Sequence, residues 1–143
     1  GIRFKESDVR PMGRDTRGVR GIRLRDGDEV VAAACVDEGE ELLLVTSGGY
    51  GKRTKVAEFP MRNRGGIGVK AIKLTRVRGV LVGALAVSAG DHAFVTSSDG
   101  IVIRQAVDDI SRQRRDSTGV RVMNLEDDAT ISAIALVPRE DDE

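Results

Sequence analysis

The residues with the clearest capacity for chemistry are arginines and lysines set among glycines. The segment Arg62-Asn-Arg-Gly-Gly-Ile-Gly68 places two guanidinium groups beside three glycines. Glycines let the backbone approach a ligand closely with its N–H groups, and guanidinium groups bind phosphate oxygens through paired hydrogen bonds. The segment therefore predicts a phosphate-binding loop. The residues predicted to contribute are Arg62, Arg64, Gly65, Gly66, Gly68, Lys70 and Lys73.

The same arrangement occurs three times along the chain. Gly18, Gly68 and Gly119 are separated by 50 and 51 residues, and each is preceded nine residues earlier by an apolar residue and followed six residues later by a leucine. Fixed spacing on both sides of a polar loop indicates an internal repeat. The basic residues predicted to bind phosphate in the other two repeats are Arg14, Arg17 and Arg20 in the first, and Arg112, Arg114, Arg115 and Arg121 in the third.

Short strands are expected to position these loops. In the second repeat we expect strands at 52–59, 69–74, 80–87 and 92–96, the last followed by a turn at 97–100. Short β-branched runs punctuated by Gly-Gly and Asp-Gly dipeptides are typical of strands and hairpins, and no long helical periodicity occurs. A period near 50 residues with about four strands is that of propeller blades. The sequence predicts an all-β fold, a partial β-pinwheel or propeller of four-stranded blade repeats.

Charge is sorted along the chain, although 23 basic and 23 acidic residues balance. Basic residues outnumber acidic ones six to one in 10–25, nine to one in 52–78 and four to one in 112–121, whereas 26–41 and 126–143 are acidic. Arginine outnumbers lysine 18 to 5, and arginine is the better bidentate phosphate ligand. We read 26–41 as a strand between two acidic turns. The basic segments coincide with the repeated loops.

Several classes of protein are disfavoured by composition. The chain has one cysteine, one histidine and no tryptophan, which excludes a disulfide scaffold, a cysteine zinc site and most histidine-based catalysis. Aromatic residues make up 3%, too few for a base-stacking single-strand binder. No membrane span or signal peptide is visible, so a cytoplasmic location is expected. We expect Cys35 in the core, His92 as an ordinary strand residue and Tyr50 as a structural turn residue.

Three sequence features together resemble a known family. They are the loop Arg62-Asn-Arg-Gly-Gly-Ile-Gly-Val69, the phrase Thr46-Ser-Gly-Gly-Tyr-Gly-Lys-Arg-Thr54, and the repeated strand Gly-Val-(Arg/Lys)-X-(Ile/Met)-X-Leu. Over residues 1–137 the chain resembles the last three blades of the C-terminal domain of the DNA gyrase A protein, in an actinobacterial-like form. The resemblance implies a six-bladed β-pinwheel that exchanges strands between blades. It also implies a basic outer rim around which double-stranded DNA wraps.

The resemblance further implies partners and a division of labour. The parent would be an A subunit that joins gyrase B subunits in an A2B2 heterotetramer, supports ATP-dependent negative supercoiling and acts at the nucleoid in the bacterial cytoplasm. ATP, Mg²⁺ and the cleavage chemistry would belong to other domains, so no catalytic residue, cofactor or metal is expected here. The family's box, Gln-(Arg/Lys)-Arg-Gly-Gly-(Arg/Lys)-Gly, is altered at Asn63 and Ile67. We therefore expect this stretch to carry only part of the wrapping surface.

The repeats are expected at about 1–50, 51–100 and 101–137, followed by an acidic tail at 138–143. Both ends fall within a repeat, which predicts a fragment of a longer array. The tail has two interpretations: it increases solubility, or it folds over the basic rim and competes with DNA.

Other functions stay open at this point. The related topoisomerase IV protein has a similar domain, although the well-preserved repeat spacing favours gyrase. A β-propeller protein-interaction platform that uses acidic and basic faces is a second class. A purely structural interpretation of the loop at 62–68 is a solvated Arg-Gly turn. An enzyme such as a propeller hydrolase is disfavoured, because the chain has one histidine, no nucleophile elbow and no recurring carboxylate pair.

Overall fold

Short β-branched and aliphatic runs form the regular structure. The computed structural model describes residues 1–37 and 39–138, and these contain strands and 3-10 helices but no α-helix. Predicted strands 80–87 and 92–96 are confirmed to within one residue. The elements in chain order are η1 (Glu6–Asp8), β1 (Glu41–Thr46), β2 (Tyr50–Lys55), η2 (Val56–Glu58), β3 (Leu81–Val87), β4 (His92–Ser97), β5 (Val102–Ala106), η3 (Val107–Asp109), β6 (Val120–Arg121) and β7 (Ile131–Leu136).

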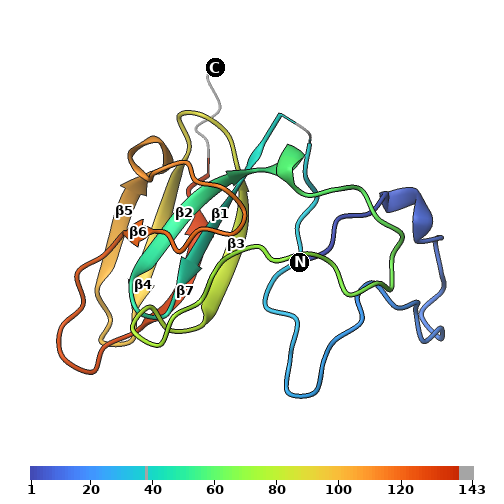
Figure 1. The fold of residues 1–143 in the computed structure, drawn as a ribbon, viewed down its shortest axis with the longest axis horizontal. Helices are drawn as coiled ribbons and strands as arrows, with labels where there is room; N and C mark the ends of the chain where they lie inside the picture. The colour runs from blue at the N-terminus through green and yellow to red at the C-terminus, as the bar shows by residue number, and fades with distance from the viewer. Residues whose placement is uncertain (38, 139–143) are drawn as a thin grey trace.

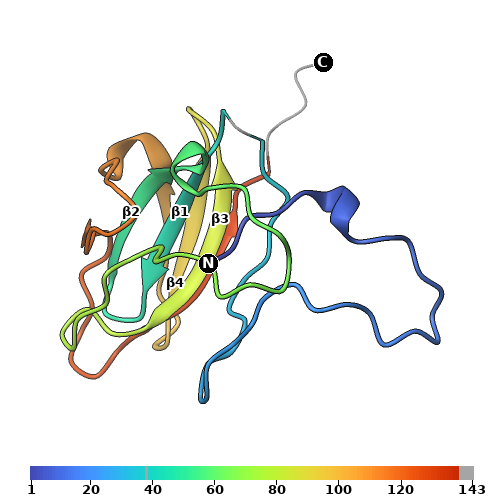
Figure 2. The same ribbon diagram turned by 45° about the vertical axis from the view of Figure 1, so that its right-hand side comes forward.

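Two antiparallel sheets form the body of the molecule. One has four strands in the order β3-β1-β2-β6, and the other has three in the order β5-β4-β7. They pack face to face, as Figures 1 and 2 both show. The core between them is aliphatic and almost fully buried, so burial of apolar surface holds the sheets together. It includes Leu43, Val45 and Val87 from the first sheet and Ala93, Val95 and Ile131 from the second.

Each sheet draws on more than one sequence repeat. The β1–β2 hairpin crosses position 50, and β6 of the third repeat pairs with β2 of the second through Tyr50↔Arg121 and Gly51↔Val120. Strands are therefore exchanged between repeats. The first sheet has four strands, of which β2 and β3 correspond to strands predicted for the second repeat, whereas β4 lies in the other sheet. The all-β fold is confirmed.

The predicted strand at 69–74 is not formed. The segment is extended but joins no sheet, and its bonds are made to irregular chain: Val69 N donates to Gly1 O (2.7 Å) and Lys73 N donates to Ser117 O (3.0 Å). Alternating apolar and basic residues suit a half-buried strand, but a ladder needs a neighbouring strand in register. The strand predicted at 52–59 likewise ends early, at Lys55, where η2 begins.

The predicted strand within 26–41 is also absent as far as the described residues show, because regular structure after η1 begins only at Glu41. Most of residues 1–37 runs as extended loops on the side of the body away from β5 (Figure 1). Cys35 is exposed there, so its assignment to the core was wrong. An apolar run is buried only where a second surface covers it. Residues 139–143, most of the predicted acidic tail, lie outside the described residues.

Close backbone approach explains the third repeated glycine. Gly119 has φ +89°, and a Cβ added there would lie 2.8 Å from Gly51 O. Gly100 has almost the same φ, +88°, but a Cβ there would meet nothing within 4 Å. A comparison of substitutions at these two glycines therefore distinguishes the cost of a left-handed backbone from the cost of steric crowding.

We predict that Gly119→Ala destabilises the fold more than Gly100→Ala. The left-handed backbone costs each variant about 1–2 kcal/mol. Crowding against Gly51 adds about 1–3 kcal/mol at position 119 only. Urea denaturation of both variants measures the difference in unfolding free energy, and equal losses would contradict the crowding.

Candidate nucleic-acid interface

The second-repeat loop, residues 60–68, is held against the first repeat by backbone hydrogen bonds. Figure 1 shows this loop, in green, beside the extended N-terminal chain. Its glycines allow the close approach that these bonds require. The bonds are Arg62 N to Arg3 O (2.8 Å), Gly65 N to Gly21 O (2.6 Å) and Arg23 N to Gly66 O (2.8 Å).

The third-repeat loop, residues 111–119, is held against the second repeat in the same way. Gln113 N donates to Arg53 O (2.8 Å), and Lys73 N donates to Ser117 O (3.0 Å). These donors and acceptors lie 50 or 51 residues from their counterparts in the preceding loop. The repeated sequence spacing therefore corresponds to a repeated set of hydrogen bonds between neighbours.

One arginine in each loop reaches back to a carbonyl of the preceding repeat. Arg64 Nη1 donates to Arg20 O (3.1 Å), and Arg115 Nη1 donates to Lys70 O (3.0 Å). Arg64 Nε also donates to Asp8 O (3.0 Å). Both side chains were predicted to bind phosphate. The structure places them between loops, where part of their donor capacity already serves protein carbonyls.

A second pair of arginines, which was not among the predicted phosphate ligands, reaches forward. Arg3 Nη1 donates to Phe59 O (3.1 Å), and Arg53 Nε donates to Ile110 O (2.7 Å), each at the end of the next repeat's 3-10 turn. The 50-residue spacing of these arginines was the signal that could have found them. A guanidinium can satisfy several carbonyls at once, which suits it to joining segments.

Arg112 is paired within the protein. Its Nε and Nη2 donate to the two carboxylate oxygens of Glu41 at 3.1 and 2.5 Å, and Arg53 lies 3.5 Å from the same carboxylate. The hydrogen bond from Arg112 is the main cause that lowers the pKa of the Glu41 carboxyl. Much of the charge that Arg112 would offer an external anion is therefore already balanced.

Lys52 is a fully buried ammonium beneath the third-repeat loop. Its Nζ donates to Arg114 O (2.6 Å) and Arg115 O (2.8 Å), and none of the side chain is exposed. Burial lowers the pKa of Lys52 to about 8, although Asp116 and Glu58 act in the opposite direction. In the sequence this residue is only part of a basic strand. Its role depends on carbonyls that are more than 60 positions away.

The remaining predicted side chains project outward. They are exposed and make no hydrogen bond or ion pair with the residues the structure describes, so their charge is available to an external ligand. They are Arg62, Lys70, Lys73, Arg14, Arg17, Arg20 and Arg114. Arg121 is exposed too, but it donates to Tyr50 Oη (2.9 Å) and Asn124 Oδ1 (3.3 Å).

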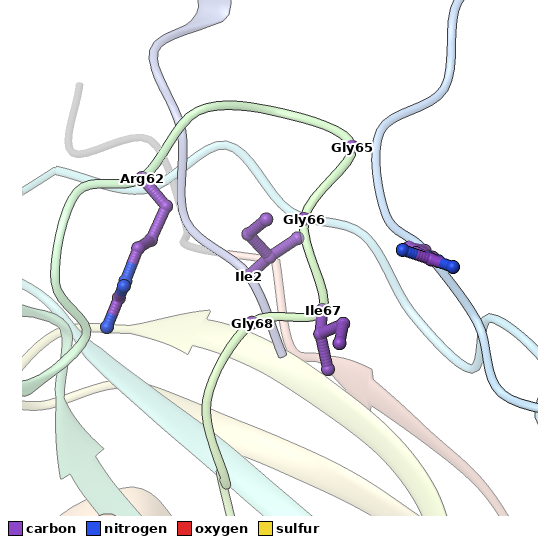
Figure 3. A pocket seen from close by; sticks show the side chains of 7 residues that line it. Ile2, Arg62, Gly65, Gly66, Ile67 and Gly68 are labelled. Atoms are coloured by element: carbon purple, nitrogen blue, oxygen red, sulfur yellow. The ribbon is translucent and has the colours of Figure 1, made fainter.

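A hollow of about 380 Å³ lies beside the second-repeat loop. Figure 3 shows Arg62 and the Gly65–Gly68 backbone on opposite sides of Ile2, and Arg23 completes the basic lining. The amides of Gly66 and Gly68 donate to no residue that the structure describes, whereas the Gly65 amide is taken by Gly21. Two of the three predicted glycine amides thus have no acceptor among the described residues. A Cβ at Gly68 would lie 2.1 Å from Gly1 O, so this position requires glycine.

Two kinds of feature were compared with the described part of the chain: membrane-spanning helices and clusters of metal-ligating side chains. No helix there is long and apolar enough to cross a membrane. No group of three or more His, Cys, Asp or Glu side chains within 1–37 and 39–138 could hold a metal ion.

Comparison with known proteins identifies relatives. The family model described as DNA gyrase C-terminal domain, beta-propeller, matches residues 1–37, 40–88 and 91–138. The DNA gyrase A protein of Staphylococcus epidermidis is 44% identical over 143 residues, and that of Staphylococcus aureus is 42% identical over 144. In both cases the match covers 99% of this chain and 16% of the relative.

Solved structures show the same fold. A DNA gyrase A C-terminal domain superposes with a TM-score of 0.86 at 32% identity, over 93% of this chain and 45% of that one. A DNA topoisomerase IV C-terminal domain superposes with a TM-score of 0.86 at 25% identity, over 94% and 42%. The chain therefore spans less than half of either solved domain.

The buried ammonium predicts a pH-dependent stability. Between about pH 8 and the ordinary lysine pKa of 10.5, the folded chain has released the Lys52 proton while the unfolded chain still binds it. Stability contributed by this group therefore rises with pH in that window and is flat below it. Urea titrations should show the unfolding free energy of wild type rising relative to Lys52→Met from pH 8 to 10.5. Parallel pH profiles would show that Lys52 titrates normally.

Proposed function

Because this chain belongs to the family of the DNA gyrase A C-terminal domain, we propose that it binds the backbone of double-stranded DNA and wraps it without regard to sequence. The observation that supports this most directly is the repeated loop geometry. Two basic loops, of which the second-repeat loop is Gly-rich, are held in equivalent poses by equivalent hydrogen bonds, and each presents basic side chains outward.

Phosphate contacts explain why no sequence preference is expected. Lysine and arginine side chains that meet phosphate oxygens position a duplex but do not read its bases. Loops repeated on successive blades place these charges at intervals along one rim, so a duplex that follows them must bend. Bending costs on the order of 1–6 kcal/mol per 20–30 base pairs, which further phosphate contacts offset.

Rigid attachment of the loops favours binding. Arg64 and Arg115 hold each loop on the repeat before it, so the loops need not become ordered when DNA arrives. Ordering a loop on binding lowers affinity, and preorganisation avoids that cost. In this proposal these two arginines position the surface, whereas Arg62, Lys70 and Lys73 contact the phosphates.

The proposal extends to the parent protein. This chain spans 16% of the length of the curated relatives that it matches. The parent is a gyrase A protein that acts with gyrase B subunits, in an A2B2 assembly, to introduce negative supercoils into bacterial nucleoid DNA in the cytoplasm. ATP, Mg²⁺ and DNA cleavage are assigned to other parts of that assembly, and this stretch supplies DNA binding without a cofactor. A topoisomerase IV protein is the alternative, favoured by an equally good superposition at lower identity.

Salt dependence provides the test. In the full-length protein, replacing Arg62, Lys70 and Lys73 by alanine should weaken binding to a linear duplex. It should also reduce the slope of log K against log salt by about 0.9 for each phosphate that is no longer neutralised. The linking-number shift trapped on relaxed circular DNA by a nicking-closing enzyme should shrink in parallel.

Lys55→Ala/Arg104→Ala is the control, because it removes two exposed charges that are not among the predicted phosphate ligands. It should leave the salt slope closer to the wild-type value. If the loop variant bound DNA with unchanged slope and linking-number shift, the loops would not be the contact surface. The protein-interaction platform would then be the better interpretation.

A further inference from the structure

The turn that follows the repeated leucine changes its charge in the second repeat only. In the first and third repeats it is acidic, Arg25-Asp-Gly-Asp-Glu29 and Glu126-Asp-Asp128. In the second it is Thr75-Arg-Val-Arg-Gly79, so arginines stand where the first repeat has Asp26 and Asp28. This turn is absent from the set of loops assigned above to DNA.

The basic turn is docked tightly on the β1–β2 hairpin. Gly48 N donates to Arg78 O (2.9 Å), and Ser47 N donates to Val80 O (2.8 Å). A Cβ on Gly48 would lie 2.6 Å from Arg78 O, so only glycine permits this approach. The backbone of Arg78 is therefore held in place.

Three distant segments converge where the turn meets the hairpin. The Arg78 guanidinium carbon lies 4.5 Å from the centre of the Tyr50 ring, and that of Arg121 lies 5.2 Å from it. Arg121 Nη2 donates to Tyr50 Oη (2.9 Å). A phenol that accepts a hydrogen bond keeps its own O–H to donate elsewhere. We call these three side chains the Tyr50 clamp.

The Tyr50 clamp gathers positive charge, and no residue that the structure describes supplies a counterion. Neither Arg78 nor Arg121 forms an ion pair with any residue in 1–37 or 39–138, and Arg78 Nε is buried without a hydrogen-bond partner. The ring face attracts both cations, but it carries no net charge to neutralise them. A guanidinium stacked on a ring keeps its edge N–H groups for a planar or tetrahedral oxyanion.

We propose that the Tyr50 clamp binds a phosphate of the DNA backbone, adding a contact point outside the Gly-rich loops. This inference rests on the DNA binding proposed above. Arg78 and Arg121 supply the charge and the forked donors, the phenol O–H supplies a third donor, and the ring positions both guanidinium groups. Tyr50 then has a binding role besides its place in β2.

The test uses a linear duplex with the full-length protein. Tyr50→Leu keeps every charge but removes the ring, whereas Arg78→Lys and Arg121→Lys keep the charge but remove the fork. Each should weaken DNA binding by about three- to tenfold, and Arg78→Ala/Arg121→Ala should reduce the salt slope by about 0.9, the value for the one phosphate that the Tyr50 clamp neutralises. Arg76→Lys is the matched control, because Arg76 lies in the same turn without stacking on the ring, and it should bind as wild type.

The outcomes separate this inference from the function on which it rests. If wild type bound DNA with a steep salt slope, Arg62→Ala weakened it, and Tyr50→Leu, Arg78→Lys and Arg121→Lys all bound as wild type, the Tyr50 clamp would be overturned and the proposed function would stand. If wild type showed no salt-dependent binding, the proposed function itself would fail. Thermal melting shows whether Tyr50→Leu folds. If it does not, Arg78→Lys and Arg121→Lys still test the inference, because Arg78 is half-buried and Arg121 is exposed.

Free inorganic phosphate is the other ligand that offers the Tyr50 clamp the same oxyanion as the DNA backbone. Inorganic phosphate at millimolar concentration should raise the melting temperature of wild type and Tyr50→Leu equally, because one isolated anion gains none of the neighbouring contacts of a duplex. If phosphate stabilised wild type but not Tyr50→Leu, and DNA binding were unchanged, the clamp would belong to a small phosphate ligand and the DNA assignment would be overturned.

Discussion

The structure depends on a reciprocal exchange of hydrogen bonds between neighbouring repeats. A Gly-rich loop has too few side chains to bury and no strand partner of its own, so its backbone groups must be satisfied elsewhere. Here the preceding repeat satisfies several of them, including Arg62 N, Gly65 N and Gly66 O. Arg23 and Lys73 donate amides to successive loops, and Arg64 and Arg115 return guanidinium hydrogen bonds to the repeat before. Loop geometry is thus a property of adjacent repeats.

This exchange divides the basic residues into two populations that composition alone does not separate. Lys52, Arg64 and Arg115 donate hydrogen bonds to carbonyls inside the molecule, and Arg112 is balanced by Glu41. Residues such as Arg62 remain exposed without an internal partner among the described residues. Some of the basic residues therefore stabilise the loops that present the other basic residues to solvent. In the same way, one tyrosine ring holds two arginines beside it.

The local hydrophobic pattern predicted an element correctly wherever burial against the core alone was enough to determine its structure. The apolar runs of β3 and β4 were found because the core buries them whatever the loops do. The alternating segment 69–74 was misassigned, since its pattern suits a strand but its neighbours are irregular chain. Cys35 was misplaced for a related reason, because an apolar sequence specifies a preference for burial and not the surface that supplies it.

The sequence by itself determined the repeat, the all-β class, the family and the basic character of the loops, because spacing and residue type are written directly in it. Only the tertiary structure decided which charges are buried, paired or free. Lys52 meets carbonyls of Arg114 and Arg115, and Tyr50 meets Arg78 and Arg121, across separations that no local pattern encodes. The physical reason is strand exchange: a residue's partners belong to another repeat, so they exist only once the repeats have docked.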